Sequence, residues 1–296
     1  LRCGADPQEP LNKEGKRPMH FAPVDGGIRQ LLIMPAKYGH SAVGSADAGL
    51  FAAVSNGDAK PIATALADGA DVDAVDVSGD TALGMAVERK SAPLVEALLS
   101  AGAQGQVAQA TAPPPLVRAA RADWLDGVKL LLKHGCSPSA AALQGDATAM
   151  HHSSLDAAIA RELLAAGYEV NRRDRRGRTA LWVAMEGGSN WSAMDKIKML
   201  LEHKADPNIA DNEGVTPLMA WSSQSWWSQQ SHIEDTFALL MKAGADVKAV
   251  DKEGRGIFAQ SRLMNPRVVV LLSKAGADVN AVDPKTGNTA LHTVTQ

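Results

Sequence analysis

The sequence has few cysteines, few aromatic residues and no long apolar run. Among its 296 residues there are 2 cysteines, and Phe, Trp and Tyr together make up 4%. No apolar stretch approaches the roughly 20 residues that a transmembrane helix requires, so we expect no membrane insertion. The formal net charge of −3 gives no global attraction to nucleic acid, which is therefore not an expected partner.

Motifs of catalysis and cofactor binding are missing as well. There is no Gly-rich phosphate loop, no His-Glu-x-x-His and no paired Cys-x-x-Cys. The segment Gly39-His40-Ser41 lacks the second glycine of a hydrolase nucleophile elbow. The pair His151-His152 suits a shared metal poorly, because neighbours on a helix point about 100° apart. We expect one histidine at the start of a helix, the other in solvent, and no catalytic residue, cofactor or metal.

A short phrase, however, recurs along the chain at an almost constant spacing. Complete Gly-Ala-Asp copies stand at 4–6, 69–71, 244–246 and 276–278, with degenerate copies between them. The third positions, at 6, 41, 71, 104, 137, 169, 206, 246 and 278, lie 30 to 40 residues apart. A period close to 33 predicts a row of stacked repeats rather than one globular enzyme domain.

Each repeat predicts two short helices followed by a tight turn. In the clearest copy, Thr81 is suited to cap a helix over residues 82–87. A second helix carries an apolar stripe of helical period, and Gly102 is suited to end it. The stripe consists of Leu94, Val95, Leu98 and Leu99. The predicted fold is all-α, with helix-turn-helix units joined by short hairpin loops and stacked on one another.

In these features the chain resembles the ankyrin repeat family. The family phrase Gly-x-Thr-Pro-Leu-His is matched in part at 79–83, 177–181, 214–218 and 287–292, and the closing phrase at 271–280. Most copies carry Ala in place of Pro, and Gly84, Trp182 and Met219 stand where the family has His. The resemblance implies an ankyrin-type solenoid that binds another protein, commonly through hairpin tips and first helices.

The repeat positions predict a single solenoid over residues 1–296, with about eight units and partial units at its ends. The approximate units are 12–43, 46–74, 77–107, 112–140, 145–173, 176–210, 213–249 and 253–282, followed by a half-unit or cap at 286–296. Cys3 and Cys136 fall about four repeats apart, so at roughly 8–10 Å a step they are too distant for a disulfide. We expect Cys136 to be a small core residue.

One hairpin differs from its acidic neighbours. Residues 171–178 contain five arginines, whereas the hairpins around 71–80 and 246–253 carry several carboxylates. The arginines are Arg172, Arg173, Arg175, Arg176 and Arg178. Two interpretations are open: they pair with acidic residues of adjacent tips, or they form a row that binds an acidic surface of a partner. Arginine is frequent at binding interfaces because its planar guanidinium makes paired hydrogen bonds.

Two neighbouring repeats are longer and hold five of the six tryptophans. The closing phrase follows the capping threonine by 23 residues after Thr81, but by 27 after Thr179 and 30 after Thr216. The extra residues are expected between the two helices. Two of these tryptophans, Trp182 and Trp221, lie in or next to first helices, and we expect them to pack in the stack. The insertions hold Trp191, Trp226 and Trp227, expected either to cover the lengthened helices or to anchor a partner.

These features predict a non-catalytic protein-binding module, monomeric when unbound. Its Ala-rich, degenerate repeats suggest a bacterial origin. Three roles fit: an immunity or inhibitor protein that masks a toxin or enzyme, a secreted effector that binds a host protein, or a regulatory or targeting arm of a larger enzyme. The chain opens without Met inside a repeat phrase, so we expect upstream residues. It would be cytoplasmic or, if a signal segment has been removed, periplasmic or secreted.

Overall fold

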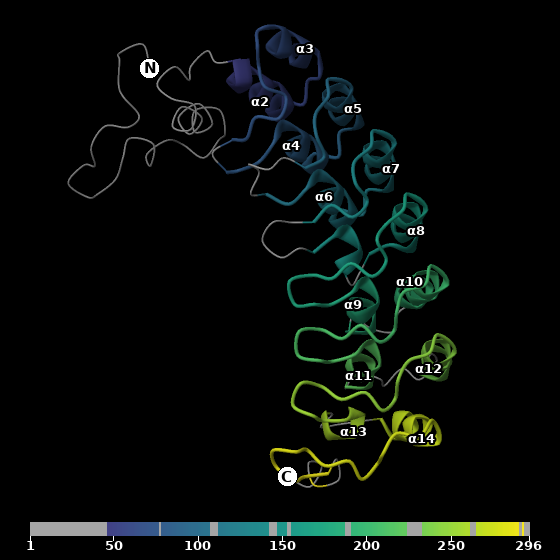
Figure 1. Ribbon diagram of the computed structural model, residues 1–296. Helices are drawn as coiled ribbons and strands as arrows, with labels where there is room; N and C mark the ends of the chain where they lie inside the picture. The colour runs from purple at the N-terminus through teal and green to yellow at the C-terminus, as the bar shows by residue number, and fades with distance from the viewer. Residues whose placement is uncertain are drawn as a thin grey trace, which may run out of the picture.

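Short helices follow one another in pairs along a single curved row (Figure 1). The computed structural model describes residues 46–76, 78–106, 112–141, 147–152, 155–186, 191–223, 233–260, 265–289 and 292. Within these residues there is no β-strand, only isolated antiparallel bridges in the hairpins. The predicted all-α solenoid is therefore confirmed. The predicted unit boundaries remain a proposal.

The helices form two columns, with the hairpins projecting beside the first (Figure 1). The first-helix column consists of α2 (Ala46–Asn56), α4 (Ala82–Glu88), α6 (Pro115–Arg121), the 3-10 helix η3 (Ala149–His151), α9 (Ala180–Glu186), α11 (Pro217–Ser222) and α13 (Ile257–Gln260). The second-helix column consists of α3 (Lys60–Ala67), α5 (Ala92–Ser100), α7 (Leu125–Lys133), α8 (Ala157–Ala165), α10 (Trp191–Glu202), α12 (Ile233–Lys242) and α14 (Pro266–Lys274).

Two of the first helices, α4 and α11, begin at threonine caps, as the sequence predicts for α4. The Thr81 hydroxyl accepts a hydrogen bond of 3.0 Å from the backbone N–H of Gly84, which leads α4 out of the preceding hairpin. Thr216 caps α11 in the same way. The second helix of the Thr81 repeat ends where Gly102 adopts φ +93°, a left-handed conformation that favours glycine. Caps and glycines thus set the length of each helix.

The core is a continuous apolar layer between the two columns. The predicted stripe of α5 is buried, and it packs between α4 and the neighbouring repeats. Cys136 is also a core residue, as expected, and its burial raises the pKa of the thiol to about 11. Because no helix is long enough to bury its apolar face alone, each repeat is stable only against its neighbours.

Gly84 occupies a family histidine position, and its neighbours explain the departure. A Cβ atom at Gly84 would lie 2.3 Å from the carboxylate of Asp80. That carboxylate contacts the buried guanidinium of Arg118 in the next repeat at 2.7 Å, and Arg118 also reaches Glu88 at 2.7 Å. An ion pair between repeats therefore fills the space that a histidine side chain would need.

The repeat around residues 145–173 departs from the predicted pattern. In place of a first α-helix it has only the three-residue η3. His151 is the third and last residue of η3, where its side chain bonds back to the Thr148 cap, and burial lowers its pKa. His152, placed in solvent by the sequence analysis, is instead partly buried. The shortened turn leaves backbone carbonyls of this segment in need of other donors.

Lys196 of α10 supplies those donors. Its side chain is fully buried, and Nζ donates to the carbonyl oxygens of Met150 at 2.8 Å and His152 at 2.7 Å. In a complete α-helix these carbonyls would accept from backbone N–H groups four residues further on. Lys196 makes no ion pair with the described residues. Burial lowers its pKa to about 7, and a neutral amine still has two N–H donors for the two carbonyls.

This site predicts a pH-dependent stability. Because the pKa of Lys196 falls from 10.5 to about 7 on folding, the unfolded chain binds more protons between these pH values. The contribution of Lys196 to the free energy of unfolding should therefore rise from pH 7 to pH 10, by up to about 4 kcal/mol at 1.36 kcal/mol per pKa unit, and the raised pKa of Cys136 offsets part of this rise above pH 9. Urea unfolding across this range should show the rise in the wild type and a much smaller one in Lys196→Met. An equal rise in both proteins would contradict the assignment.

Candidate partner-binding surface

The hairpin tips form one connected surface along the stack. The backbone N–H of Asn212 donates to the carbonyl of Arg176 at 2.7 Å, and that of Lys252 donates to Glu213 at 2.9 Å. At Gly177, with φ +78°, a Cβ atom would lie 2.4 Å from the Asn212 side chain. We call the tips at 174–177, 211–214, 251–254 and 283–287 the hairpin surface. Its backbone is fixed before any partner arrives.

The carboxylates of the hairpins serve mainly to close the turns. Asp174 accepts backbone hydrogen bonds of 2.9 Å from both Arg176 and Arg178. Asp211 and Asp251 accept from their own hairpins in the same pattern. Asp174 and Asp251 are buried. The acidic character of the neighbouring hairpins in the sequence is therefore largely structural rather than a free charged surface.

Three of the five arginines of residues 171–178, which we call the arginine hairpin, have partners within the chain. Arg172 pairs with Glu169 at 3.2 Å. Arg173 donates to the carbonyls of Gly177 at 2.9 Å and Ala210 at 3.0 Å, which ties its hairpin to the next. Arg178, the third, joins the hairpin to α9.

Arg178 lies between its own turn and the first helix that follows. Its guanidinium pairs with Asp174 at 2.8 Å and with Glu186 at 3.1 Å. It also lies over the ring of Trp182, with Cζ 5.4 Å from the ring centroid, a favourable cation–π distance. These contacts are with its own hairpin and helix, not with acidic residues of adjacent tips.

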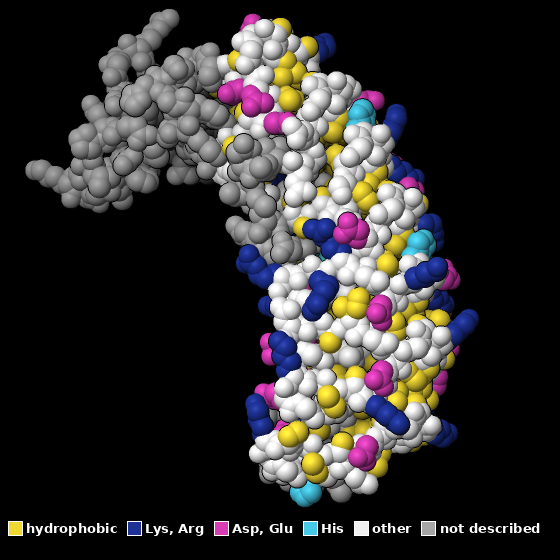
Figure 2. All heavy atoms as spheres, in the orientation of Figure 1, with side chains coloured by type: hydrophobic (Ala, Val, Ile, Leu, Met, Phe, Trp, Pro, Cys, Tyr) yellow, Lys and Arg dark blue, Asp and Glu magenta, His cyan; other side chains and the backbone are white. Residues whose placement is uncertain are grey.

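Arg175 and Arg176 are the two exposed arginines at the tip itself. Neither side chain makes an ion pair within the described part of the chain. Their backbone groups are engaged: both carbonyls accept hydrogen bonds from Asn212, and the Arg176 N–H donates to Asp174. Figure 2 shows charged side chains following the hairpin edge of the molecule. Within the arginine hairpin, Arg175 and Arg176 are the guanidinium groups available to another molecule.

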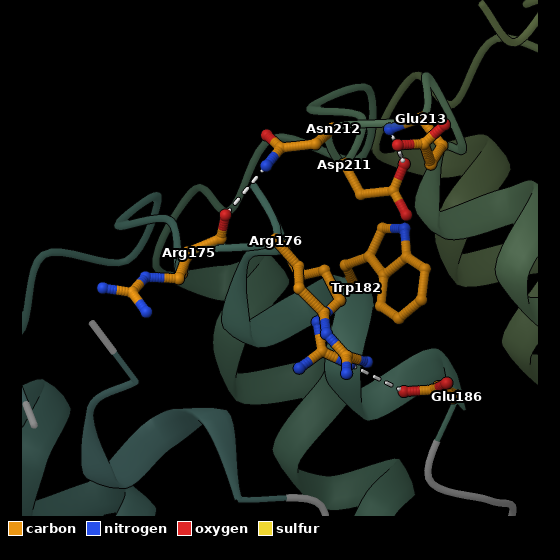
Figure 3. Close-up of a pocket in the computed structure, with 8 residues that line it drawn as sticks. Arg175, Arg176, Trp182, Glu186, Asp211, Asn212 and Glu213 are labelled. Atoms are coloured by element: carbon orange, nitrogen blue, oxygen red, sulfur yellow. Dashed lines mark hydrogen bonds and ion pairs between the residues drawn. The ribbon is translucent and has the colours of Figure 1, made fainter. Parts of the chain in front are cut away.

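A pocket of about 390 Å³ opens between this tip and the next, with Trp182 and Arg178 in its wall (Figure 3). Arg175 and Arg176 line one side, and Asp211, Asn212 and Glu213 line the other. In Figure 3, Arg175 extends away from Trp182, while the tip of the next hairpin lies above the indole ring. The pocket therefore offers positive charge on one rim and carboxylates on the other.

Trp182 explains how the stack tolerates a tryptophan at a family histidine position. In the preceding repeat, His151 accepts from the Thr148 backbone N–H at Nδ1, so Nε2 carries the proton and donates to the Arg178 carbonyl at 3.0 Å. Trp182 Nε1 donates to the Val215 carbonyl at 2.8 Å. Each accepting carbonyl belongs to the residue before the next capping threonine. The indole thus makes the same bond between repeats as the imidazole.

The remaining tryptophans divide between packing and unassigned positions. Trp221 is buried, as expected, and stacks on Phe237 with ring centroids 6.0 Å apart. Trp191 does not lie in a loop, as its polar surroundings predicted, but is the first residue of α10, since only four residues separate α9 from α10. Trp226 and Trp227 lie outside the described residues. Their role as partner anchors remains a prediction.

The described residues contain no group of three or more His, Cys, Asp or Glu side chains that could hold a metal ion. None of their helices is both long and apolar enough to cross a membrane.

Sequence comparisons place the chain among ankyrin repeat proteins. The family model for ankyrin repeats, in three copies, matches residues 50–142 and 149–251. The ankyrin repeat protein YahD of Escherichia coli strain K12 is 29% identical over 202 residues, covering 65% of this chain and 94% of YahD. The ankyrin repeat and KH domain-containing protein mask-1 of Caenorhabditis elegans is 29% identical over 49% of this chain. The chain spans 6% of mask-1 and 17% of the human ankyrin repeat domain-containing protein 63.

Solved structures share the architecture. The human ASB11 ankyrin repeat domain superposes with a TM-score of 0.57 at 22% identity, covering 77% of this chain and 98% of that domain. An ankyrin repeat domain from Acinetobacter baumannii AYE superposes with a TM-score of 0.55 at 28% identity, covering 67% of this chain and 98% of that domain. The fold predicted from the repeat spacing is thus also found in its structural neighbours.

The bond made by Trp182 predicts a specific cost of substitution. Trp182→Phe keeps an aromatic ring but leaves the Val215 carbonyl without its donor, so it should destabilise the chain by about 1–3 kcal/mol. Trp124→Phe is the matched control, because Trp124 Nε1 has no hydrogen-bond partner among the described residues. Urea unfolding of both variants checks this. If Trp182→Phe costs no more than Trp124→Phe, the bond between repeats contributes nothing measurable.

Proposed function

The chain belongs to the ankyrin repeat family, and we propose on this basis that it is a non-catalytic module that binds another protein through the arginine hairpin. Ankyrin repeats are protein-interaction modules, so a protein partner is the expectation for the fold. The observation that carries the proposal is the exposed pair Arg175 and Arg176, held on a fixed turn beside a pocket. Its partner presents an acidic surface.

The other three arginines act as supports in this proposal. Arg172, Arg173 and Arg178 hold the tip against its own loop, the next hairpin and α9. The tip is therefore ordered before binding, and little conformational entropy is lost on association. A rigid pair of exposed guanidinium groups can contact carboxylates through paired hydrogen bonds, and its charge accelerates encounter with an acidic surface.

The first of the two insertions begins beside the pocket. Glu186, which lines the pocket, is the last residue of α9, and the first insertion follows it directly. Trp191 stands at the far end of that insertion. We retain Trp191, Trp226 and Trp227 as proposed contacts, secondary to the arginines.

A narrower proposal is that the partner is a toxin or an enzyme that the chain masks. Two relatives with most of their length matched, YahD and the Acinetobacter domain, come from bacteria, which supports a bacterial setting for such a role. A preformed, charged surface also suits an inhibitor that must bind without rearrangement. Stoichiometric loss of the captured partner's activity on adding the chain would support masking. A partner that keeps full activity in the complex would leave binding in place and remove the inhibitory role.

Charge reversal at the tip tests the binding proposal. Arg175→Glu/Arg176→Glu should weaken binding of the native partner at least tenfold, mainly through a slower association rate, and reduce the salt dependence. Surface plasmon resonance against the partner captured from the native cell would measure both. Arg173 is left unchanged, because its hydrogen bonds to Gly177 and Ala210 make it part of the scaffold.

The matched control is Arg161→Glu/Lys198→Glu, an equal change of charge on the exposed faces of α8 and α10. Both double variants should unfold within about 0.5 kcal/mol of the wild type, as exposed substitutions usually do. If the control weakens binding as much as the tip variant, only the net charge matters, and the arginine hairpin is not the binding site.

A further inference from the structure

The bridge position of the hairpins is apolar at Val75 and Ala141, basic at Arg173, and apolar again at Val250 and Val282. Arg173, Val250 and Val282 each form the antiparallel bridge of their hairpin, with Thr179, Gly256 and Thr289 as the respective bridge partners. Ala210 occupies this position in the hairpin between the first two, where its carbonyl accepts from Arg173. Val250 is 58% exposed and Val282 is 50% exposed. Two apolar side chains therefore stand in line with the arginine hairpin.

The carboxylates beside the two valines are engaged within the chain. Glu253 pairs with Arg255 at 2.9 Å and also with Lys285 of the next hairpin. Arg255 in turn pairs with the buried carboxylate of Asp251 at 2.7 Å. This end of the hairpin surface thus offers exposed apolar area with engaged carboxylates, whereas the other end offers the guanidinium groups of Arg175 and Arg176, which make no ion pair within the described residues.

We propose that the occupant of this surface is an extended segment of the partner, acidic at one end and apolar at the other. Its acidic residue lies at Arg175 and Arg176, and its apolar side chains lie on Val250 and Val282. This inference rests on the proposed protein-binding function and gives the partner's segment a defined chemistry and direction.

The repeat distance predicts the spacing of the residues in that segment. Packed helices lie roughly 8–10 Å apart, so the arginine tip and Val250 are separated by two steps, roughly 16–20 Å. A polyproline II segment rises about 3.1 Å per residue with three residues per turn, so every third side chain returns to one edge after about 9.3 Å. The match predicts an acidic residue at position i, with apolar residues at about i+6 and i+9.

A β-strand does not meet this requirement, because its side chains alternate with period two and residues three apart point to opposite faces. An α-helix would need a different spacing, about seven residues per repeat, since it rises 1.5 Å per residue. The three conformations therefore predict different sequences for the partner segment, which makes the inference testable with synthetic peptides.

The experiment uses the full chain and fluorescein-labelled peptides, with binding followed by fluorescence anisotropy. The in-register peptide is proline-rich, with Glu at position 3 and Leu at positions 9 and 12. One control has the order of Glu and Leu reversed, a second has one residue inserted between them, and a third is a helical peptide with seven-residue spacing. The in-register peptide should bind at least tenfold more tightly than each control.

Variants of the chain locate the two ends. Arg175→Glu/Arg176→Glu should weaken the in-register peptide at least tenfold, and replacing its Glu by Lys should restore much of the loss. Val250→Ser/Val282→Ser should weaken it at least fivefold while leaving the thermal unfolding midpoint close to the wild type, since both side chains are exposed. Val270→Ser, an exposed valine on α14, is the control and should have no effect.

Several outcomes would overturn the inference. Equal affinity for the in-register and one-residue-shifted peptides would reduce the surface to an electrostatic attraction. Tightest binding of the helical peptide would assign a helix as occupant. A dimer in sedimentation that is lost in Val250→Ser/Val282→Ser would assign a second copy of this chain. No peptide binding at all would also overturn it, while the proposed function would still stand if the native partner responds to Arg175→Glu/Arg176→Glu.

Discussion

The whole structure depends on the bonds between repeats. Helices of 4 to 12 residues cannot bury their apolar faces alone, so each repeat is held by the next. In two successive repeats the same bond makes the connection: the ring N–H of His151, and then of Trp182, donates to the carbonyl before the next capping threonine. Backbone hydrogen bonds between the tips repeat this connection at the outer edge.

These bonds decide which charges remain for a partner. Aspartates close the turns, and arginines that could have formed a row are used to join repeats or to hold the tip. The remaining positive charge, on Arg175 and Arg176, lies on a turn that is hydrogen-bonded to the next hairpin. In the core, the amine of Lys196 is used in the same way. It donates hydrogen bonds to the two carbonyls that the shortened helix leaves without backbone donors. The candidate site thus consists of the charged groups that make no ion pair within the described part of the chain.

Local patterns in the sequence predicted the fold because they act over a few residues. The threonine cap, the apolar stripe of α5 and the terminating Gly102 all appear as expected, and so do the buried Trp221 and Cys136. Partners distant in sequence could not be predicted in this way. In the sequence Lys196 looks like an ordinary lysine on a helix. Only the structure shows that it donates a hydrogen bond to the carbonyl of Met150, 46 residues earlier in the chain.

The arginine hairpin was predictable from the sequence only in part. Its composition showed that this hairpin differs from those of the other repeats. Five arginines in eight residues did not show, however, which side chains hold the hairpin in place and which are available to a partner. Arg178 was separable only with Trp182 and Glu186 in place, and Arg173 only with the next hairpin beside it. A sign was available for Trp182 itself, since it stands where the preceding repeat has the hydrogen-bonding ring of His151.

The central claim is that a partner binds on the hairpin surface at the arginine hairpin. Hydrogen–deuterium exchange of the chain, alone and saturated with its captured partner, tests this most directly. The account predicts added protection in the hairpins around 171–178 and 248–256, with α8 and α10 unchanged. Protection confined to the second-helix column, with the hairpins exchanging as in the free chain, would contradict it.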